Sequence, residues 1–437
     1  MNVRDSEEVT GLLLDRGYSL TPSEQEADVI LFNTCSVREQ AEHKVWSNMG
    51  SLKKLKSRRP ELIIGLMGCM AKAQRETIFA RMPHVDFILG PAQLYEVPEL
   101  IETIYEERRP MKAIREKRRK EFQTISYHAG KISALVTIME GCDKVCSYCI
   151  IPYTRGPEVS RPAEQVVGEV RQLVGQGYKE VMLLGQNVNS YGTKTVRSST
   201  LRQAQGERSS GRTESKVTFS DLLEHVNAIP GIERIRFITS HPWDAVESLF
   251  EGMRDLEHVC EHLHLPVQSG SDPILEKMRR GYTAQSYLEK VALLRRYVPE
   301  VAVTTDIIVG FPGETEEDFE ATVRLMEQSR FDSAFIFNYS PRPFAAASRW
   351  ADDVPREVKD LRLQTLLKLQ EEISREKERL WIGRTAEVLV EEPGMGRTRT
   401  NLKTYFPPQD IQPGQLVRVK VNGTRGHSLL GEIINGT

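Results

Sequence analysis

Residues 139–152 read Met-Glu-Gly-Cys-Asp-Lys-Val-Cys-Ser-Tyr-Cys-Ile-Ile-Pro, and this stretch carries Cys142, Cys146 and Cys149. The C-x3-C-x2-C spacing places three thiolates on one short loop. Three sulfur ligands can hold three irons of a 4Fe–4S cluster and leave the fourth iron open. Because an open iron can bind a substrate or cosubstrate directly, the spacing favours a catalytic centre over a structural one.

Two structural interpretations of these cysteines are weaker. A closed zinc site needs four nitrogen or sulfur ligands, usually as two close pairs. Here the nearest upstream histidine is His128, and no fourth ligand follows soon after the third cysteine. A disulfide framework is disfavoured because six cysteines in 437 residues are sparse and no secretory leader is visible.

The composition is that of an ordinary globular protein. Hydrophobic residues make up 39% and charged residues 27% of the chain, and the formal net charge is −2. A nucleic-acid interface must therefore rest on local basic patches. Charged residues such as Arg4, Asp5, Glu7 and Glu8 predict no signal peptide, and no apolar run reaches membrane-spanning length. We expect a protein of the reducing cytoplasm, because thiolates must stay reduced to bind iron.

Residues 1–107 alternate between helical and strand patterns. An amphipathic helix is predicted over 6–16, and apolar strands are predicted over 27–33, 62–67 and 85–89. Such alternation is typical of a doubly wound parallel α/β sheet. Cys35 and Cys69 lie just past the ends of the first two strands, at the edge where open α/β sheets bind ligands.

A second α/β series spans residues 128–372. Six apolar strands are predicted at 132–139, 180–184, 234–239, 262–267, 302–309 and 333–339. With helical crossovers they predict a partial (β/α)6 barrel, whose functional residues lie on loops after the strand C-terminal ends. The three-cysteine loop directly follows the first strand. Residues 193–216 are rich in Ser, Arg, Thr, Gln and Gly, which predicts an exposed, mobile insertion.

Basic residues gather on both sides of this series. Residues 108–127 are interpreted as a basic, solvated linker, with contact to a nucleic-acid backbone as the alternative. Residues 373–437 show short alternating strands between Gly and Pro, which predicts a small β-barrel. Its basic side chains are candidate RNA contacts, with a solvated surface as the alternative: Arg397, Arg399, Lys403, Arg418, Lys420 and Arg425.

Further motifs accompany the three-cysteine loop in chain order. They are Tyr153-Thr-Arg-Gly156, Val159-Ser-Arg-Pro162, Leu184-Gly-Gln-Asn187, Thr239-Ser-His-Pro242, His264-Leu-Pro-Val-Gln-Ser-Gly-Ser271, Gly310-Phe-Pro-Gly-Glu-Thr315 and Tyr339-Ser-Pro-Arg-Pro343. With the loop, they resemble radical S-adenosylmethionine (SAM) enzymes of the methylthiotransferase family. Asn33-Thr-Cys-Ser-Val-Arg38 and Gly396-Arg-Thr-Arg-Thr-Asn401 resemble its tRNA-modifying, MiaB-type branch. The resemblance covers nearly the whole chain.

The resemblance implies methylthiolation of carbon 2 of N6-isopentenyladenosine at position 37 of tRNA. In that chemistry the iron left open by Cys142, Cys146 and Cys149 chelates SAM, and its reductive cleavage gives a 5′-deoxyadenosyl radical that removes the C2 hydrogen. Sulfur comes from a second, auxiliary 4Fe–4S cluster on Cys35 and Cys69, and another SAM supplies the methyl group. An adenine C–H is not acidic enough for a side-chain base, so a radical route is physically sensible.

The same resemblance implies the remaining parts of the enzyme. SAM contacts are expected from residues near the strand ends: Tyr148, Gly185, Gln186, Ser240, Gln268, Asp306, Gly310 and Gly313. The last two glycines are expected to let the backbone approach the adenine closely. The small barrel is expected to be TRAM-like, the electron donor to be a flavodoxin or ferredoxin, and the enzyme to act as a monomer without a membrane.

The chain departs from the family pattern at two places. The auxiliary cluster of the family has three cysteines, and the family register places the first of them two residues before Met1, so a truncated chain lacking the first sheet strand is expected. Phe344 stands where the family usually has glycine. Three alternatives stay open: a methylthiotransferase of a ribosomal protein S12 aspartate, a SAM-cleaving RNA-binding protein that inserts no sulfur, and a non-catalytic RNA-binding protein.

Overall fold

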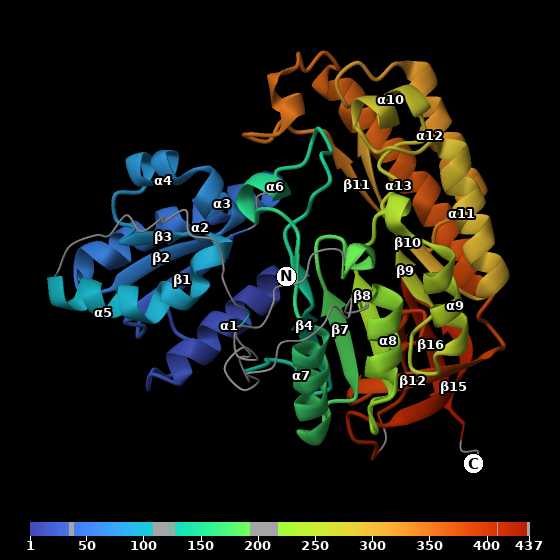
Figure 1. The fold of residues 1–437 in the computed structure, drawn as a ribbon, viewed down its shortest axis with the longest axis horizontal. Helices are drawn as coiled ribbons and strands as arrows, with labels where there is room; N and C mark the ends of the chain where they lie inside the picture. Colours follow the sequence, from blue (N-terminus) through green and yellow to red (C-terminus); the bar gives the residue numbers. More distant parts are fainter. Residues whose placement is uncertain (35–38, 108–121, 123–126, 193–216, 409, 435–437) are drawn as a thin grey trace, which may run out of the picture.

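The computed structural model describes residues 1–34, 39–107, 122, 127–192, 217–408 and 410–434. Its N-terminal unit contains a parallel sheet of three strands in spatial order, β1 (Val29–Thr34), β2 (Ile63–Gly68) and β3 (Phe87–Leu89). The helices of this unit are α1 (Asn2–Leu14), α2 (Glu39–Arg58), α3 (Cys69–Ala73), α4 (Arg75–Arg81) and α5 (Val97–Glu107). They lie on both sides of the sheet (Figure 1).

Alternate residues of β2 enter two different hydrophobic cores. Ile64 and Leu66 pack with residues of α2 and α4, whereas Ile63 and Met67 pack with residues of α1 and α5. Successive side chains of a strand point to opposite faces, so a strand that is apolar throughout is covered on both sides. The predicted doubly wound sheet is confirmed.

The first two strands of the chain pair directly with each other. Their parallel register ends where Thr34 lies opposite Gly68. Cys69 follows Gly68 and begins α3, whereas Cys35, which follows Thr34, lies outside the described residues. The register therefore brings the chain ends that precede both cysteines to the same edge of the sheet.

Six parallel strands form the central unit, and each lies where a strand was predicted: β4 (Ser133–Thr137), β7 (Glu180–Leu184), β8 (Arg234–Ile238), β9 (His262–His264), β10 (Ala302–Val309) and β11 (Ser333–Asn338). They form two halves, β4-β7-β8 and β9-β10-β11, joined by a bridge between Ile235 and Val259. The covering helices are α7 (Ala163–Gly175), α8 (Phe219–Asn227), α9 (Glu247–Asp255), α11 (Ala284–Tyr297), α12 (Glu316–Ser329) and α13 (Arg356–Arg379). The partial (β/α)6 barrel is confirmed (Figure 1).

Four short elements among the described residues lie at the C-terminal ends of these strands. They are β5 (Met139–Glu140), β6 (Val159–Ser160), α6 (Ile151–Thr154) and α10 (Asp272–Lys277). The cysteine loop runs from β5 to α6, at the end of the barrel where ligands are expected.

The C-terminal unit is a closed barrel of five strands, as predicted: β12 (Thr385–Glu392), β13 (Met395–Thr398), β14 (Lys403–Tyr405), β15 (Leu416–Thr424) and β16 (Ser428–Ile433). The predicted boundary between residues 372 and 373 stays a prediction. It falls inside α13, which runs unbroken to Arg379 because no Pro or Gly interrupts its helical sequence.

Two buried arginines of β8 join the two barrels. Arg234 donates to the backbone oxygen of Arg397 at 2.5 Å, and Arg236 donates to the backbone oxygens of Thr398 and Arg399, both at 2.7 Å. The small barrel consequently lies at the end of the central barrel opposite the cysteine loop (Figure 1).

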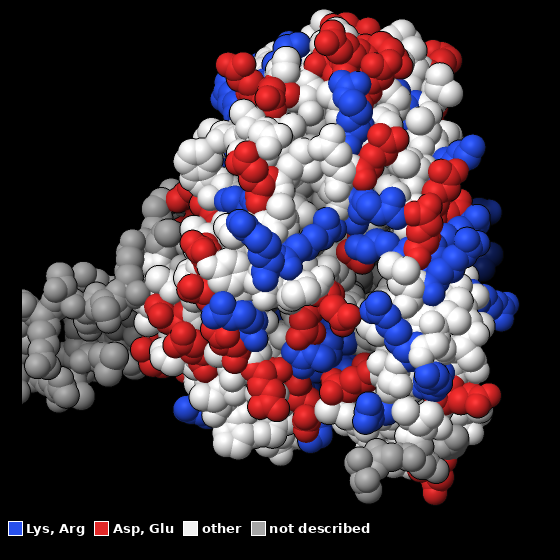
Figure 2. All heavy atoms as spheres, turned by 90° about the vertical axis from the view of Figure 1, so that its right-hand side faces the viewer, with Lys and Arg blue, Asp and Glu red and all other residues white. Residues whose placement is uncertain are grey.

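The described helices include none that combines the length and the apolar character needed to cross a membrane. Figure 2 shows that the face on the right of Figure 1 carries Lys and Arg interspersed with Asp and Glu. Such a mixed surface agrees with the net charge of −2. Contacts with nucleic acid must therefore come from local groups of residues.

Candidate active site

The three thiols of the cysteine loop lie close enough for the charge of one to change the pKa of the others. Burial raises the pKa of Cys142 to about 11 and that of Cys149 to about 12, and the charge of Cys146 raises both. Metal coordination deprotonates such thiols. The described side chains include no trio of Cys, His, Asp or Glu arranged around a single metal ion, the geometry that mononuclear zinc requires. Three mutually close sulfurs fit an iron–sulfur cluster, in which each sulfur binds its own iron.

The cysteine loop is clamped to two other segments of the barrel through Ser147. Its backbone N–H donates to the Met278 oxygen at 3.1 Å, and its hydroxyl donates to the Lys277 oxygen at 2.7 Å. Its backbone oxygen accepts from the Ala347 N–H at 2.7 Å. These hydrogen bonds fix the loop against the segments that contain Met278 and Ala347.

Arg280 supplies a charged contact to these sulfurs. Its guanidinium, on a side chain only 5% exposed, donates to Cys146 Sγ at 3.4 Å, to the Pro266 oxygen at 2.7 Å and to the Tyr282 hydroxyl at 2.8 Å. Burial acts to lower the pKa of Arg280, but Tyr148, Tyr282 and Cys146 raise it well above its ordinary value. A fixed positive charge therefore lies against one of the three cysteines of the loop.

Replacing Arg280 with glutamine is expected to lower the reduction potential of the cluster, because hydrogen bonds and positive charge at ligand sulfurs stabilise its reduced form. We expect a fall on the order of 60 mV, equivalent to about 1.4 kcal/mol for a one-electron couple. The measurement is an EPR-monitored redox titration, with Arg254→Gln as the exposed control. An unchanged midpoint potential in the Arg280 variant, at full iron content, would rule out this role.

Gly185 and Gln186 support the base of the cysteine loop. The Gln186 side-chain oxygen accepts from the Gly141 N–H at 2.6 Å. Gly185 must be glycine, because a Cβ there would come within 3.1 Å of both Met139 Sδ and Val188 Cγ1. Their predicted contact with the SAM amino group stays a prediction.

The other strand-end residues come together along one rim. The Ser240 N–H donates to the His264 oxygen at 3.3 Å, and the Gln268 N–H donates to the Asp306 oxygen at 2.9 Å. Asp306 also lies 3.5 Å from the imidazole of His264. The structure therefore places Ser240, Gln268 and Asp306 as neighbours, as the barrel prediction requires.

Three buried polar atoms on this rim have no hydrogen-bond partner among the described residues: Asn187 Oδ1, Ser240 Oγ and His241 Nε2. His241 Nδ1 accepts from the Trp243 N–H at 3.1 Å, so the proton is on Nε2. Burial lowers the pKa of His241 to about 2, so the ring is neutral. An unpaired buried polar group costs about 1–3 kcal/mol. These atoms fit a polar ligand such as SAM, which offers amine, carboxylate and hydroxyl groups.

The two glycines after β10 each lie beside a lysine side chain. Gly310 and Gly313 have positive φ angles of 69° and 76°, which explains why glycine is needed. The side chain of Lys359 fills the space beside Gly310, and that of Lys277 fills the space beside Gly313. The expected approach of adenine to these backbones stays a prediction. Tyr148 packs against a small apolar cluster that includes Phe311, and its contact with SAM also stays a prediction.

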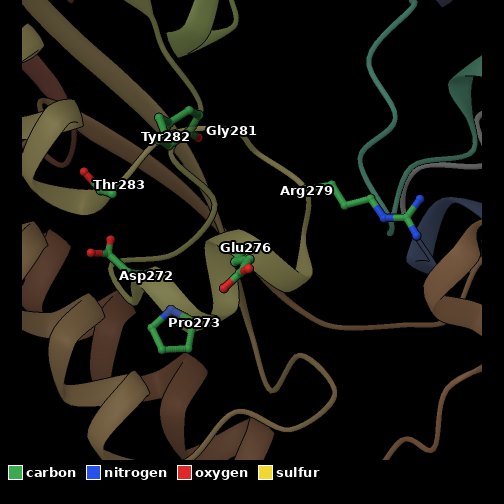
Figure 3. A pocket seen from close by; sticks show the side chains of 7 residues that line it. All are labelled: Asp272, Pro273, Glu276, Arg279, Gly281, Tyr282 and Thr283. Carbon is green, nitrogen blue, oxygen red and sulfur yellow. The ribbon is translucent and has the colours of Figure 1, made fainter.

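A surface hollow of about 710 Å³ lies near α10 and is lined by Asp272, Pro273, Glu276, Arg279, Gly281, Tyr282 and Thr283 (Figure 3). None of the predicted SAM residues lines it. Arg279 extends away from the other six side chains (Figure 3). Tyr282 of this lining also contacts the ring of His241 edge-on, at a centroid distance of 6.0 Å.

The N-terminal cysteine site adjoins the cysteine loop. Helix α3 begins at Cys69, which is 2% exposed, and packs against α6, which begins two residues after Cys149 (Figure 1). Arg155, directly after α6, forms a buried ion pair with Asp5 of α1. Burial acts to lower the pKa of Arg155, but Asp5 and then the nearby Cys69 raise it. One guanidinium thus links α1, the loop and the Cys69 site.

The predicted RNA contacts on the small barrel separate into two groups. Arg399 donates to the Glu261 carboxylate and to the Val259 oxygen, both at 2.7 Å. Arg399 therefore connects the two barrels, and its role as an RNA contact stays a prediction. The RNA role stays a prediction for the others: Arg397, which pairs with Glu391, Lys403, which lies over the Tyr405 ring, and the exposed Arg418, Lys420 and Arg425.

Comparison with known proteins agrees with this site. The radical SAM superfamily model matches residues 136–326, and the model of uncharacterized protein family UPF0004 matches residues 1–90. The match over 136–326 contains the cysteine loop and four of the six barrel strands in full, so this part of the chain is a radical SAM domain.

Curated relatives give the finer family. The tRNA-2-methylthio-N(6)-dimethylallyladenosine synthase of Protochlamydia amoebophila is 43% identical over 99% of this chain and 94% of its own. Those of Clostridium botulinum (strain Loch Maree) and Moorella thermoacetica are both 44% identical, over 99% and 100% of this chain and 95% and 96% of their own. The chain belongs to the tRNA-2-methylthio-N(6)-dimethylallyladenosine synthase family of radical SAM methylthiotransferases. SAM and a 4Fe–4S cluster are the cofactors that this family implies.

Proposed function

We propose that this enzyme inserts a methylthio group at C2 of N6-dimethylallyladenosine at position 37 of tRNA. The observation that carries the proposal is the packing of α3, which begins at Cys69, against α6, which follows the cysteine loop. A radical centre and a sulfur source must both reach one adenine carbon, and this packing holds the two cysteine sites side by side.

Different residues of this chain are proposed to hold the cluster, to place charge beside it and to orient SAM. Cys142, Cys146 and Cys149 hold the cluster, and Arg280 fixes a positive charge on Cys146. Bound together, the cluster and SAM supply the one-electron chemistry that removes the C2 hydrogen. Ser240 and Asn187 orient SAM through the polar atoms that lack partners among the described residues.

The auxiliary cluster is proposed to be held by Cys69 together with Cys35. The parallel register that ends at Thr34 and Gly68 supports this assignment, since the next residue on each strand is a cysteine. The enzyme is proposed to act in the cytoplasm, because its thiolates need a reducing compartment. We also propose that it acts as a monomer and that a flavodoxin or ferredoxin is its electron donor.

Replacing Cys69 with alanine is expected to abolish sulfur insertion while SAM is still cleaved. Iron should fall by about four atoms per chain, the content of one 4Fe–4S cluster. The measurement combines iron analysis, 5′-deoxyadenosine release and nucleoside mass spectrometry. Met70→Ala, at the adjoining buried position, is the matched control. Undiminished methylthiolation by the Cys69 variant would exclude Cys69 as a ligand.

The substrate is tested by deleting the gene. Mass spectrometry of total tRNA should then show N6-dimethylallyladenosine without its 2-methylthio form. The alternative substrate, an aspartate of ribosomal protein S12, predicts unchanged tRNA and loss of the methylthio group from that protein. Membership of the tRNA-modifying family favours the first outcome.

A further inference from the structure

Two exposed aromatic rings stack beside the cysteine loop. Tyr153 of α6 and Phe344, in the loop after β11, have ring centroids 3.8 Å apart and planes inclined by 10°. The two residues are 39% and 57% exposed. The pair joins two segments that are far apart in the sequence. Exposed apolar surface of this kind marks interaction sites.

The backbone of Phe344 is strained. Its φ angle is 67°, in the left-handed region that favours glycine and disfavours bulky side chains. Glycine is also the residue that the family pattern leads one to expect here. Phe344 is exposed, so a hydrophobic core does not compensate for the strain. Strain that persists without a packing benefit indicates a functional role for the ring.

The ring pair lies between the two cysteine sites. Tyr153 follows Cys149 by four residues, and Lys72 follows Cys69 by three. The ammonium group of Lys72 lies 5.5 Å from the centroid of the Tyr153 ring. Tyr153 covers one face of Phe344, and no other described ring stacks on its second face. Stacking surface next to positive charge is the combination that proteins use to bind unpaired nucleotides.

We propose that Tyr153 and Phe344 form a stacking platform for an unpaired base of the tRNA substrate, with Lys72 beside it for a neighbouring phosphate. The base belongs to a nucleotide next to the target adenosine, because the target itself must reach the rim of strand ends. This inference rests on the proposed function, since it requires an RNA substrate. It adds a contact that the TRAM-like barrel cannot make, because that barrel lies at the opposite end of the molecule (Figure 1).

The test uses full-length reconstituted enzyme and an anticodon stem-loop RNA that carries 2-aminopurine on either side of position 37. Wild-type enzyme should quench the fluorescence of one of the two probes by stacking. Phe344→Gly removes the ring and relieves the backbone strain, so the variant should fold at least as stably. Its Kd for the stem-loop should rise about 5- to 150-fold, the effect of losing one base–aromatic stack. Phe344→Trp should preserve the quenching.

The control variant is Leu361→Ala, which removes another exposed apolar side chain, 69% exposed on α13. Its Kd should equal that of wild type. Equal affinity and equal quenching for wild type and Phe344→Gly would overturn the platform and leave the ring pair to a protein partner, with the proposed function intact. A wild-type enzyme that binds no stem-loop would contradict the proposed function itself, so the two failures are distinguishable.

Discussion

Replacing Cys149 with alanine is expected to abolish the reductive cleavage of SAM. The cluster has three cysteine ligands on one loop, and the loss of Cys149 leaves one of its irons without a protein ligand. The Cys149 sulfur also accepts a hydrogen bond from the Ile151 N–H at 3.5 Å, and burial raises the pKa of its thiol to about 12. The measurement is 5′-deoxyadenosine release under dithionite, which should fall to the level of a protein-free blank.

The matched control is Cys260→Ala. Cys260 is 1% exposed and lies before β9, away from the cysteine loop. Its replacement should leave both the iron content and the SAM cleavage unchanged. Cleavage that survives in the Cys149 variant would show that this loop does not hold the radical-generating cluster.

Replacing Asp5 with alanine is expected to destabilise the protein by about 3–5 kcal/mol, the cost of leaving one partner of a buried ion pair unpaired. The side chains of Asp5 and Arg155 are each 3% exposed. The variant should also cleave SAM without a matching amount of sulfur insertion, because this pair joins α1 to the segment that follows α6. The ratio of methylthiolated tRNA to released 5′-deoxyadenosine should fall.

Two further variants isolate this effect. The double variant Asp5→Leu, Arg155→Met removes both charges and should recover most of the lost stability, since an apolar pair can replace a buried ion pair. Arg16→Ala breaks an exposed pair with Glu99 and should leave stability nearly unchanged. Thermal unfolding by calorimetry gives the comparison. Equal losses in the Asp5 and Arg16 variants would contradict the buried linkage.

Much of the fold was predictable because its signals are local. Apolar runs bounded by turn residues gave all six barrel strands, and alternation gave the closed C-terminal barrel. The cysteine loop was predictable because its three ligands are close in sequence. Such patterns depend on neighbouring residues, which the chain displays directly.

The parts that were not predictable depend on long-range burial. Arg4 and Asp5 belong to a charged N-terminal segment, yet both are 2% exposed and form ion pairs with Glu169 and Arg155 of the central unit. Arg280 belongs to an Arg-Arg-Gly run that resembles an exposed turn, and only the folded barrel places it on Cys146. Arg399 looks like an unpaired basic residue in the sequence. In the fold it pairs with Glu261, which lies 138 residues earlier in the chain.

The central claim is that one chain both cleaves SAM and delivers sulfur to tRNA. It is tested most directly by incubating the reconstituted enzyme with SAM, a reductant and tRNA that carries N6-dimethylallyladenosine, followed by nucleoside mass spectrometry. We predict the 2-methylthio nucleoside together with 5′-deoxyadenosine. Release of 5′-deoxyadenosine with tRNA that remains unmodified would contradict the claim.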